Sequence, residues 1–371
     1  MYTGLIEHYR DRLPLAKDTK AISIGEGNTP LIRLHNIPRE IGFSGELYVK
    51  FEGLNPTGSF KDRGMTMAVT QAVHEGSKAI ICASTGNTSA AAAAYAARAG
   101  ITAFVLIPEG KIALGKLAQA VMHGSVVVQI QGNFDDGMRL VKEVAETLPL
   151  TIVNSINPYR LQGQKTAAFE IVEALGRAPD YHCLPVGNAG NITAYWTGYS
   201  EAAGIETASN TLPKNLRTYQ TGGLSKNRPV MCGYQAAGAA PFLSCGPVTH
   251  PETVATAIRI GNPQSWDAAW AASKESGGWF DKFSDEEILA TQKLLAVKEG
   301  VFCEPASATS VAGALRDIRS GKIKAGSVVT CTLTGHGLKD PDIAMREGLK
   351  GVVQVPAERG AVEKALAARL G

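Results

Sequence analysis

The segment NPTGSFKDRG, Asn55–Gly64, carries a lysine that is a candidate for covalent chemistry. Loop-forming residues lead to Lys61, which stands at the predicted start of a helix. A cation is poorly placed there, because the helix dipole is positive at that end. A lysine near a helix N-terminus and shielded from water has a lowered pKa, which an imine-forming amine needs. The alternative is a solvated lysine beside Asp62 and Arg63.

Three further turns follow apolar runs and have the composition of anion-binding turns. They are STGNTS at Ser84–Ser89, NSINPYR at Asn154–Arg160, and GNAGN at Gly187–Asn191. Glycine lets the backbone approach a ligand, a helix N-terminus favours an anion, and arginine binds an oxyanion through two parallel bonds. The alternatives are a plain helix cap in the first turn, a turn around Pro158 with an exposed arginine in the second, and a tight turn without a ligand in the third.

A fifth turn, TGHGLKD at Thr334–Asp340, follows an apolar run near the C-terminus. Ligands of α/β proteins bind at the carboxyl ends of the strands, so a threonine hydroxyl here could bond to a ligand. His336 is a possible general base. A histidine between two glycines is more often a local structural feature, and we favour that interpretation.

These turns lie between alternating short apolar runs and longer helical patterns. Strands alternating with helices predict parallel βαβ units, hence an α/β fold with two doubly wound lobes and mainly parallel sheets. Strands that are apolar throughout, such as Val126–Ile130, predict helices on both faces of the sheet. The predicted strands are Leu47–Glu52, Ala79–Ala83, Ala103–Ile107, Val126–Ile130, Thr151–Asn154, His182–Val186 and Val328–Leu333, and the predicted helices are Lys61–Glu75, Thr88–Ala99, Ala113–His123, Asp135–Thr147, Thr166–Leu175 and Ile192–Ala203.

Two segments fall outside this alternation. Thr207–Arg228 is polar and without a clear period, which predicts an exposed loop or insertion. Val362–Leu370 has the pattern of a short amphipathic helix.

The composition sets the class of protein. Of the 371 residues, 44% are hydrophobic and 19% charged, which is typical of a globular chain with a core. The formal charge is only +3 and no block of Lys or Arg occurs, so we expect neither nucleic acid nor an anionic membrane as a partner. No signal peptide or membrane-spanning run is visible, and six cysteines without a CxxC pair predict buried thiols in the cytoplasm and no metal site.

The order of the motifs resembles one enzyme family. GEGNTPL at Gly25–Leu31, followed by NPTGSFKDRG, STGNTSAA, GNAGN and TGHGLKD, closely resembles the threonine synthases, which are pyridoxal-phosphate (PLP) enzymes with the tryptophan synthase β-subunit fold. The resemblance covers about Gly25 to Asp340. It implies a large PLP-binding domain of residues 1–60 and 156–371, a small substrate-binding domain of residues 61–155, and a homodimer.

The resemblance also implies a role for each motif. Lys61 would bind the cofactor as a Schiff base and then transfer protons, Asn87 would bond its phenolic oxygen, and Thr334 would face its ring nitrogen. The cofactor phosphate would be held by Gly187, Asn188, Ala189, Gly190 and Asn191. The substrate carboxylate would be held by Ser84, Thr85 and Thr88, and the substrate phosphate by Asn154, Ser155 and Arg160, with Asn188.

The implied reaction converts O-phospho-L-homoserine and water to L-threonine and phosphate, by γ-elimination and β-addition of water. One alternative is a threonine or serine dehydratase on the same fold, which would use Lys61 but lack phosphate-binding groups in the substrate site. Another is a catalytically silent PLP-binding or regulatory protein. An intact Lys61 and phosphate loop disfavour the second alternative.

Overall fold

A computed structural model describes residues 1–84, 86–109, 114–132, 134–155, 157–217, 223–244, 246–348 and 352–370. Met1–Lys339 form one compact unit, and Asp340–Gly371 form a second. The second unit contains helices α12 (Pro341–Gly348) and α13 (Arg359–Leu370). The predicted C-terminal helix is therefore present and begins three residues earlier than expected.

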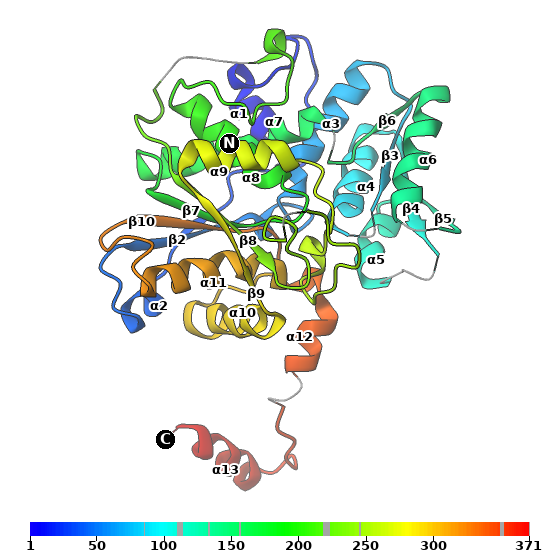
Figure 1. Cartoon of the computed structure of the whole chain (residues 1–371). Helices are drawn as coiled ribbons and strands as arrows, with labels where there is room; N and C mark the ends of the chain where they lie inside the picture. The colour runs from blue at the N-terminus through cyan, green and yellow to red at the C-terminus, as the bar shows by residue number, and fades with distance from the viewer. Residues whose placement is uncertain are drawn as a thin grey trace. The chain divides into compact units, whose positions relative to one another are not determined.

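A six-stranded sheet lies at the centre of the first unit, with the strand order β1-β2-β10-β7-β8-β9. Strand β1 pairs antiparallel with β2, and the other pairs are parallel. Helices α7, α8 and α9 lie on one side of the sheet, and α10 and α11 on the other (Figure 1). The bounds are β1 Leu31–Arg33, β2 Glu46–Phe51, β7 Tyr181–Pro185, β8 Val230–Ala236, β9 Trp279–Phe283, β10 Val328–Leu333, α7 Pro158–Leu175, α8 Gly190–Ala202, α9 Trp266–Ser276, α10 Asp285–Glu299 and α11 Pro305–Arg319.

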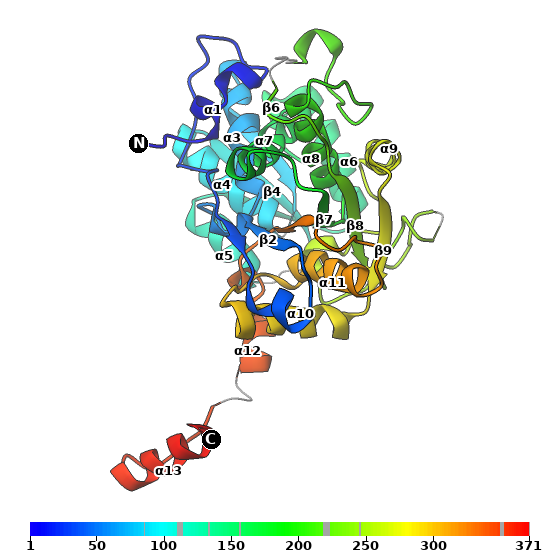
Figure 2. The ribbon, with the colours of Figure 1, turned by 90° about the vertical axis from the view of Figure 1, so that its left-hand side faces the viewer.

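The second sheet of this unit is parallel and has four strands, in the order β5-β4-β3-β6. Side chains alternate across β3: Ile80 and Cys82 pack into the core with α3 and α4, while Ile81 and Ala83 face α6. Figure 2 shows this sheet and its helices from a second direction. The bounds are β3 Ala79–Ala83, β4 Thr102–Pro108, β5 Val126–Ile130, β6 Leu150–Ile152, α3 Lys61–His74, α4 Asn87–Ala99, α5 Leu114–Met122 and α6 Phe134–Thr147.

The predicted α/β class with mainly parallel sheets is confirmed. Every strand and helix predicted between Leu47 and Ala203 is present, most with ends within one or two residues. The largest error is α7, which was predicted to begin at Thr166 and begins at Pro158. Asn157 caps this helix by accepting a bond from Tyr159 N, and Pro158 occupies its first turn. Strands β1, β8 and β9 were not predicted.

The prediction of helices on both faces of this sheet is confirmed, since the cluster with α3 and α4 lies on one face and α6 on the other, but Val126–Ile130 is not a buried inner strand. This segment is β5, the edge strand of the four-stranded sheet, and it pairs only with β4 among the described strands. Val126 is 45% exposed and Val128 39% exposed. An apolar strand sequence indicates a preference for extended backbone, and it does not by itself distinguish a central strand from an edge.

The prediction of an exposed loop or insertion at Thr207–Arg228 is confirmed for the loop, but several residues in its first part are buried. Residues 207–217 contain only the short 3-10 helix η3 (Lys214–Leu216), but Thr207, Ser209 and Leu212 are buried. Glu275 on α9 accepts bonds from the Thr207 hydroxyl and from Ala208 N, which anchors the segment. Residues 218–222 lie outside the described part of the chain.

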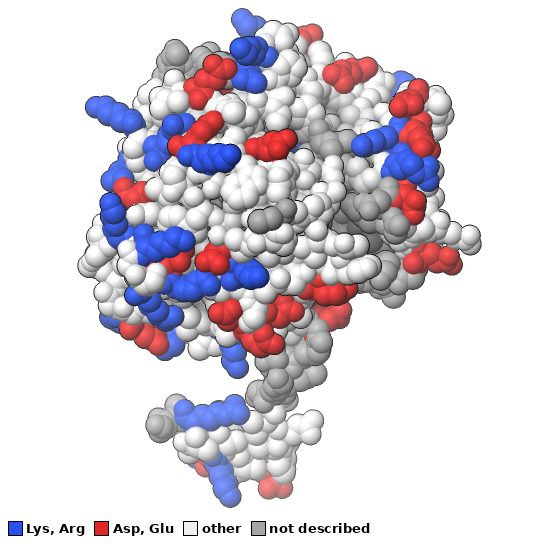
Figure 3. Space-filling view, in the orientation of Figure 1, with Lys and Arg blue, Asp and Glu red and all other residues white. Residues whose placement is uncertain are grey.

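The prediction that the cysteines are buried thiols is confirmed for those that the structure describes. Cys82, Cys183, Cys232, Cys303 and Cys331 are free and buried; Cys245 lies outside the described residues. No helix in the described part of the chain is long and apolar enough to cross a membrane. On the face shown in Figure 3, acidic and basic side chains occur among one another, without a continuous basic area.

Candidate functional site

The segment that carries Lys61 connects β2 to α3 and is tied to the turn that carries Thr334. Phe60 N donates to the Thr334 carbonyl oxygen (2.9 Å), and His336 N donates to the Gly58 carbonyl oxygen (2.9 Å). Strands β2 and β10 are parallel neighbours, so these two turns meet at the same carboxyl edge of the six-stranded sheet. Lys61 is the first residue of α3, as predicted.

Buried ion pairs of Arg63 stabilise the same segment. Arg63 donates to Glu52 on one side (2.6 Å) and to Glu170 of α7 on the other (2.6 Å). Glu170 also accepts a bond from Asn28 N, within the GEGNTPL motif. This motif therefore supports the lysine segment through α7 and Arg63.

The environment of Lys61 favours its neutral amine. Burial, the largest cause, and the positive charge of Arg160 lower the pKa of Lys61 to about 7, while the carboxylate of Glu304 acts in the opposite direction. A lysine with this pKa exists in both protonation states near neutral pH. It can therefore accept and return protons, as a general base or acid does.

Arg160, in the first turn of α7, is a buried cation at this site. It is 1% exposed, so the alternative of an exposed arginine after Pro158 was wrong. Its Nη1 donates to the Val153 carbonyl oxygen (3.0 Å), and its Nε has no partner in the described part of the chain. No carboxylate forms an ion pair with it among the described residues, and burial lowers its pKa to about 10. A buried, unpaired guanidinium is costly unless an anion binds to it.

The turn after β3 is aligned by the turn after β6. Asn154 accepts a bond from Ala83 N (3.1 Å) and donates one to Ala83 O (3.0 Å). This pairing places Ser84 beside Ser155 at the carboxyl edge of the four-stranded sheet. Ser84 accepts a bond from Gly86 N, and α4 then begins at Asn87 with Thr88 buried. Thr85 lies outside the described residues.

The GNAGN turn after β7 leads directly into the N-terminus of α8. Ala189 adopts the left-handed conformation, with φ 63°, immediately before α8, and the first N–H groups of a helix have no intrahelical partner. A Cβ at Gly187 would lie 3.0 Å from Ile258 Cα, so a larger residue would displace the backbone. Asn191 is 9% exposed, and its Nδ2 has no partner in the described part of the chain. An unused buried donor beside a helix N-terminus fits an anionic group.

Two hydrogen bonds connect the two sheets across this region. Asn188 Nδ2 donates to Ser155 Oγ (3.3 Å), and Asn87 Nδ2 donates to Glu304 (3.0 Å). The predicted site residues that the structure describes lie in the turns and helix starts that follow the strand ends of both sheets. These are Lys61, Ser84, Asn87, Thr88, Asn154, Ser155, Arg160, Gly187, Asn188, Ala189, Gly190, Asn191 and Thr334.

Sequence reasoning missed Glu304, which is 1% exposed at the start of α11. It accepts bonds from Asn87 and from the Thr334 hydroxyl (2.8 Å). Glu304 occupies the N-cap position of α11, where Ser, Thr, Asp or Asn is usual, and its side chain makes no capping bond. The sequence feature that could have identified Glu304 is an acidic residue directly before a proline at the start of a helix.

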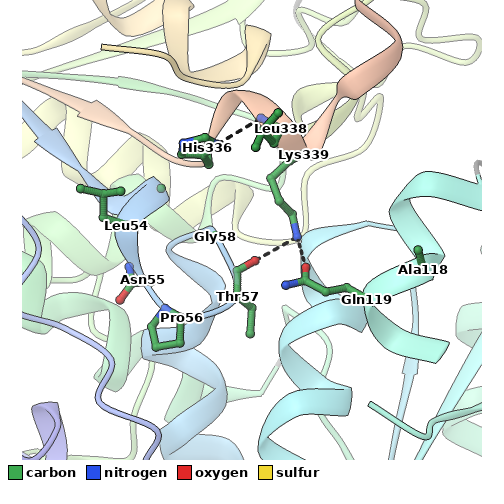
Figure 4. A pocket seen from close by; sticks show the side chains of 11 residues that line it. Leu54, Asn55, Pro56, Thr57, Gly58, Ala118, Gln119, His336, Leu338 and Lys339 are labelled. Carbon is green, nitrogen blue, oxygen red and sulfur yellow. Dashed lines mark hydrogen bonds between the residues drawn. The ribbon is translucent and has the colours of Figure 1, made fainter. Parts of the chain in front are cut away.

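His336 has a structural position, in agreement with the interpretation we favoured. Its ring stacks on Phe51 at 5.9 Å, and its Nδ1 accepts a bond from Leu338 N. It lines a pocket of about 570 Å³ beside the Asn55–Gly58 segment (Figure 4). Across this pocket, Lys339 Nζ donates to the Thr57 carbonyl oxygen (3.0 Å) and to Gln119 of α5 (2.6 Å).

Comparison with known proteins identifies similar sequences along almost the whole chain. Residues 22–335 match the family described as "Pyridoxal-phosphate dependent enzyme". A threonine synthase of Synechocystis is 54% identical over 364 residues, 96% of this chain and 90% of that protein. A threonine synthase of Mycobacterium tuberculosis is 56% identical over 366 residues, 98% and 96% of the two chains. The structure of maize serine racemase has a TM-score of 0.71 at 20% identity, covering 94% of this chain and 99% of that one, and shows the common fold.

Proposed function

The chain belongs to the pyridoxal-phosphate-dependent enzymes and, within them, to the threonine synthase family, and we propose that it converts O-phospho-L-homoserine and water to L-threonine and phosphate at the site around Lys61. It is a PLP-dependent lyase. The division into a small domain of residues 61–155 and a large domain of residues 1–60 and 156–371 is part of this proposal, as are a homodimer and a cytoplasmic location.

The buried guanidinium of Arg160 is the observation that favours O-phosphohomoserine as the substrate. A threonine or serine dehydratase acts on a substrate with one carboxylate and no phosphate. Here Arg160 places a second, buried cation beside Lys61, with an unused Nε donor. The phosphate of O-phosphohomoserine supplies the anion that this guanidinium needs. Ser155 and Asn188 lie together at the same strand edges and would bind the remaining phosphate oxygens.

Asn154 has a more limited role in this proposal than Arg160. Its amide oxygen and one amide N–H pair with the backbone of Ala83. We therefore assign Asn154 to alignment of the substrate turns, with its second N–H left for the substrate phosphate. The substrate carboxylate would bind to Ser84, Thr85 and Thr88, at the start of α4, where backbone N–H groups favour an anion.

The residues around the GNAGN turn fit the cofactor. Gly187, Asn188, Ala189, Gly190 and Asn191 would hold its phosphate, as the unpartnered Asn191 Nδ2 and the left-handed Ala189 support. Asn87 would bind its phenolic oxygen, and Thr334 would contact its ring nitrogen. When bound, pyridoxal phosphate supplies an aldehyde that links to amines and a ring that withdraws electrons from the substrate Cα.

Lys61 is the proposed proton-transfer residue. The reaction breaks the Cγ–O bond, adds the hydroxyl group of water at Cβ, and requires protons to leave Cα and Cβ and to be returned at Cγ and Cα. A lysine with a pKa near 7 can accept and donate these protons in turn. Burial of the site also excludes bulk water, which protects the reacting carbons from unwanted protonation.

The test is turnover of the purified protein supplied with PLP and O-phosphohomoserine, with threonine and phosphate measured in the same samples. We expect equal amounts of the two products, and we expect Lys61→Ala to form neither. Release of 2-oxobutanoate from threonine, with no phosphate from O-phosphohomoserine, would replace this proposal with a dehydratase. A protein that binds PLP but converts neither substrate would be a silent homologue.

A further inference from the structure

Lys339 bridges two parts of the first unit that lie on either side of a pocket. Its Nζ donates to the Thr57 carbonyl oxygen (3.0 Å) and to Gln119 Oε1 on α5 (2.6 Å), as Figure 4 shows. The pocket between these walls has a volume of about 570 Å³. Open space therefore separates the segment before Lys61 from α5 at this point, and the half-buried side chain of Lys339 joins them.

The bond to Thr57 acts on the segment that carries Lys61. Thr57 is 2% exposed, and its N–H and its hydroxyl group both donate to the carboxylate of Asp62 (2.9 and 2.8 Å), the residue after Lys61. Thr57 thus accepts a bond from Lys339 and donates two bonds to the first turn of α3. A displacement of Thr57 would therefore reach Lys61 through Asp62.

The bond to Gln119 connects the same ammonium group to the helices of the four-stranded sheet. Leu117 of α5 is 4% exposed and belongs to the hydrophobic core that also contains Tyr95 of α4. The first turn of α4 carries Thr88, which the proposed function assigns to the substrate carboxylate. The position of α5 therefore affects the position of the substrate turn.

Two other bonds attach the lysine segment to the six-stranded sheet. Phe60 N donates to the Thr334 carbonyl oxygen, and His336 N donates to the Gly58 carbonyl oxygen, so both lead to the turn after β10. Lys339 adds a connection to the other sheet. Lys61 and the substrate turn come from different sheets, so the distance between them depends on such a connection. A displacement of about 1 Å in an active site can reduce a rate about 100-fold.

We propose that Lys339 is a positioning residue for proton transfer: by holding Thr57 and Gln119 together, it keeps Lys61 at the correct distance from the substrate Cα. This inference rests on the proposed function and deepens it, since it assigns a residue to the step that Lys61 performs. Lys339 acts through Lys61 and α4 and has no contact with the cofactor in this proposal. Its loss should therefore slow the chemical step and leave binding of the cofactor almost unchanged.

Lys339→Met tests the proposal, because methionine keeps most of the apolar stem and lacks the ammonium group. The assay is turnover of the PLP-loaded protein with O-phosphohomoserine and with the same substrate deuterated at Cα. We expect kcat to fall about 10- to 100-fold, with the dissociation constant of PLP within about twofold of the wild-type value. The deuterium isotope effect should increase, because removal of the Cα proton becomes slower relative to the other steps. A smaller fraction of folded protein would lower kcat without changing the isotope effect.

Three further variants separate the bridge from a general disturbance. Gln119→Leu should reduce kcat about 3- to 10-fold, and the double variant should be no slower than Lys339→Met, since both changes break one connection. Lys339→Arg keeps the charge and the donors and should recover most of kcat. Lys324→Met is the matched control, because Lys324 is an exposed lysine between α11 and β10, and it should change neither kcat nor the isotope effect.

A second measurement needs neither substrate nor cofactor. Burial is the largest cause of the low pKa of Lys61, so a site that admits water should raise that pKa above about 7. Acylation of cofactor-free Lys339→Met at several pH values, followed by mass spectrometry, measures the change. Should Lys339→Met fail to fold, Gln119→Leu decides the question by both measurements.

The result against this inference is a kcat for Lys339→Met within about twofold of the wild type, or a lower kcat without a larger isotope effect. An unchanged titration of Lys61, or additive losses in the double variant, would also overturn it. Failure of the proposed function differs from these outcomes, because the wild type itself would then not release equal threonine and phosphate. The acylation of Lys61 would still test the role of Lys339.

Discussion

Replacement of Arg160 by glutamine should weaken binding of the substrate phosphate more than any other interaction at the site. Arg160 is almost fully buried, and its Nε has no protein partner among the described residues. Removing one partner of a buried, hydrogen-bonded charge pair costs about 2–5 kcal/mol. That corresponds to a decrease of about 30- to 5,000-fold in kcat/KM for O-phosphohomoserine. Arg160→Lys should be intermediate, because it keeps the charge and loses the planar fork.

Steady-state kinetics with O-phosphohomoserine provide the assay, together with competitive inhibition by inorganic phosphate. We expect phosphate to inhibit the wild type and to lose most of its effect on Arg160→Gln, while the absorbance of bound cofactor is retained. Arg139→Gln is the matched control, since Arg139 is exposed on α6 and pairs with Glu143. A value of kcat/KM within twofold of the wild type, with unchanged phosphate inhibition, would refute the assignment of Arg160 to the substrate phosphate.

The same substitution changes the titration of Lys61 in the cofactor-free protein. Burial of Lys61 is the largest cause of its low pKa, and the positive charge of Arg160 is the next largest. Its removal should raise that pKa above about 7, so acylation of Lys61 should require a higher pH. Mass spectrometry of protein acylated at several pH values gives this titration. A pKa that stays unchanged or falls would show that Arg160 does not act on Lys61.

Three other predictions concern stability. In cofactor-free protein, Lys61 has a pKa of about 7 when folded and an ordinary value of 10.5, so the free energy of unfolding should rise with pH across that interval. Urea unfolding at several pH values should show a smaller rise there for Lys61→Met. Burial lowers the pKa of His182 from 6.5 to about 3, so the free energy of unfolding should decrease as pH falls from 6.5 toward 3. This decrease should be smaller in His182→Asn, and equal slopes in the two proteins would contradict the prediction. Gly163→Ala places a Cβ 1.8 Å from the Arg63 carbonyl oxygen, between α7 and α3, and should reduce the free energy of unfolding by at least about 3 kcal/mol, whereas Gly246→Ala, with no atom within 4 Å, should be nearly neutral.

Local sequence predicted the elements that position the site well. Lys61 follows loop residues and begins α3, and the GNAGN turn lies between β7 and α8, because turn chemistry and helix starts depend on neighbouring residues. Val126–Ile130 shows the limit of the same reasoning. Its apolar sequence correctly predicted a strand, but only the strand order places it at an edge.

The charged residues of the site were harder to predict, because their effect depends on distant partners. The sequence placed Arg160 in a candidate oxyanion site but left its burial open, and that burial follows from the packing of α7 against the turn after β6. Glu304 meets Asn87 across a separation of 217 residues. Single-sequence patterns carry no information on such a pair, although a glutamate at the N-cap position of α11 was itself an indication.

The most direct test of the central claim is the reaction of O-phosphohomoserine in H₂¹⁸O, with mass spectrometry of both products. Elimination breaks the Cγ–O bond, so phosphate keeps its own oxygens, and the water oxygen enters at Cβ. The account predicts one ¹⁸O atom in threonine and none in the phosphate released during turnover. Labelled phosphate together with homoserine would show hydrolysis at phosphorus and would contradict the account.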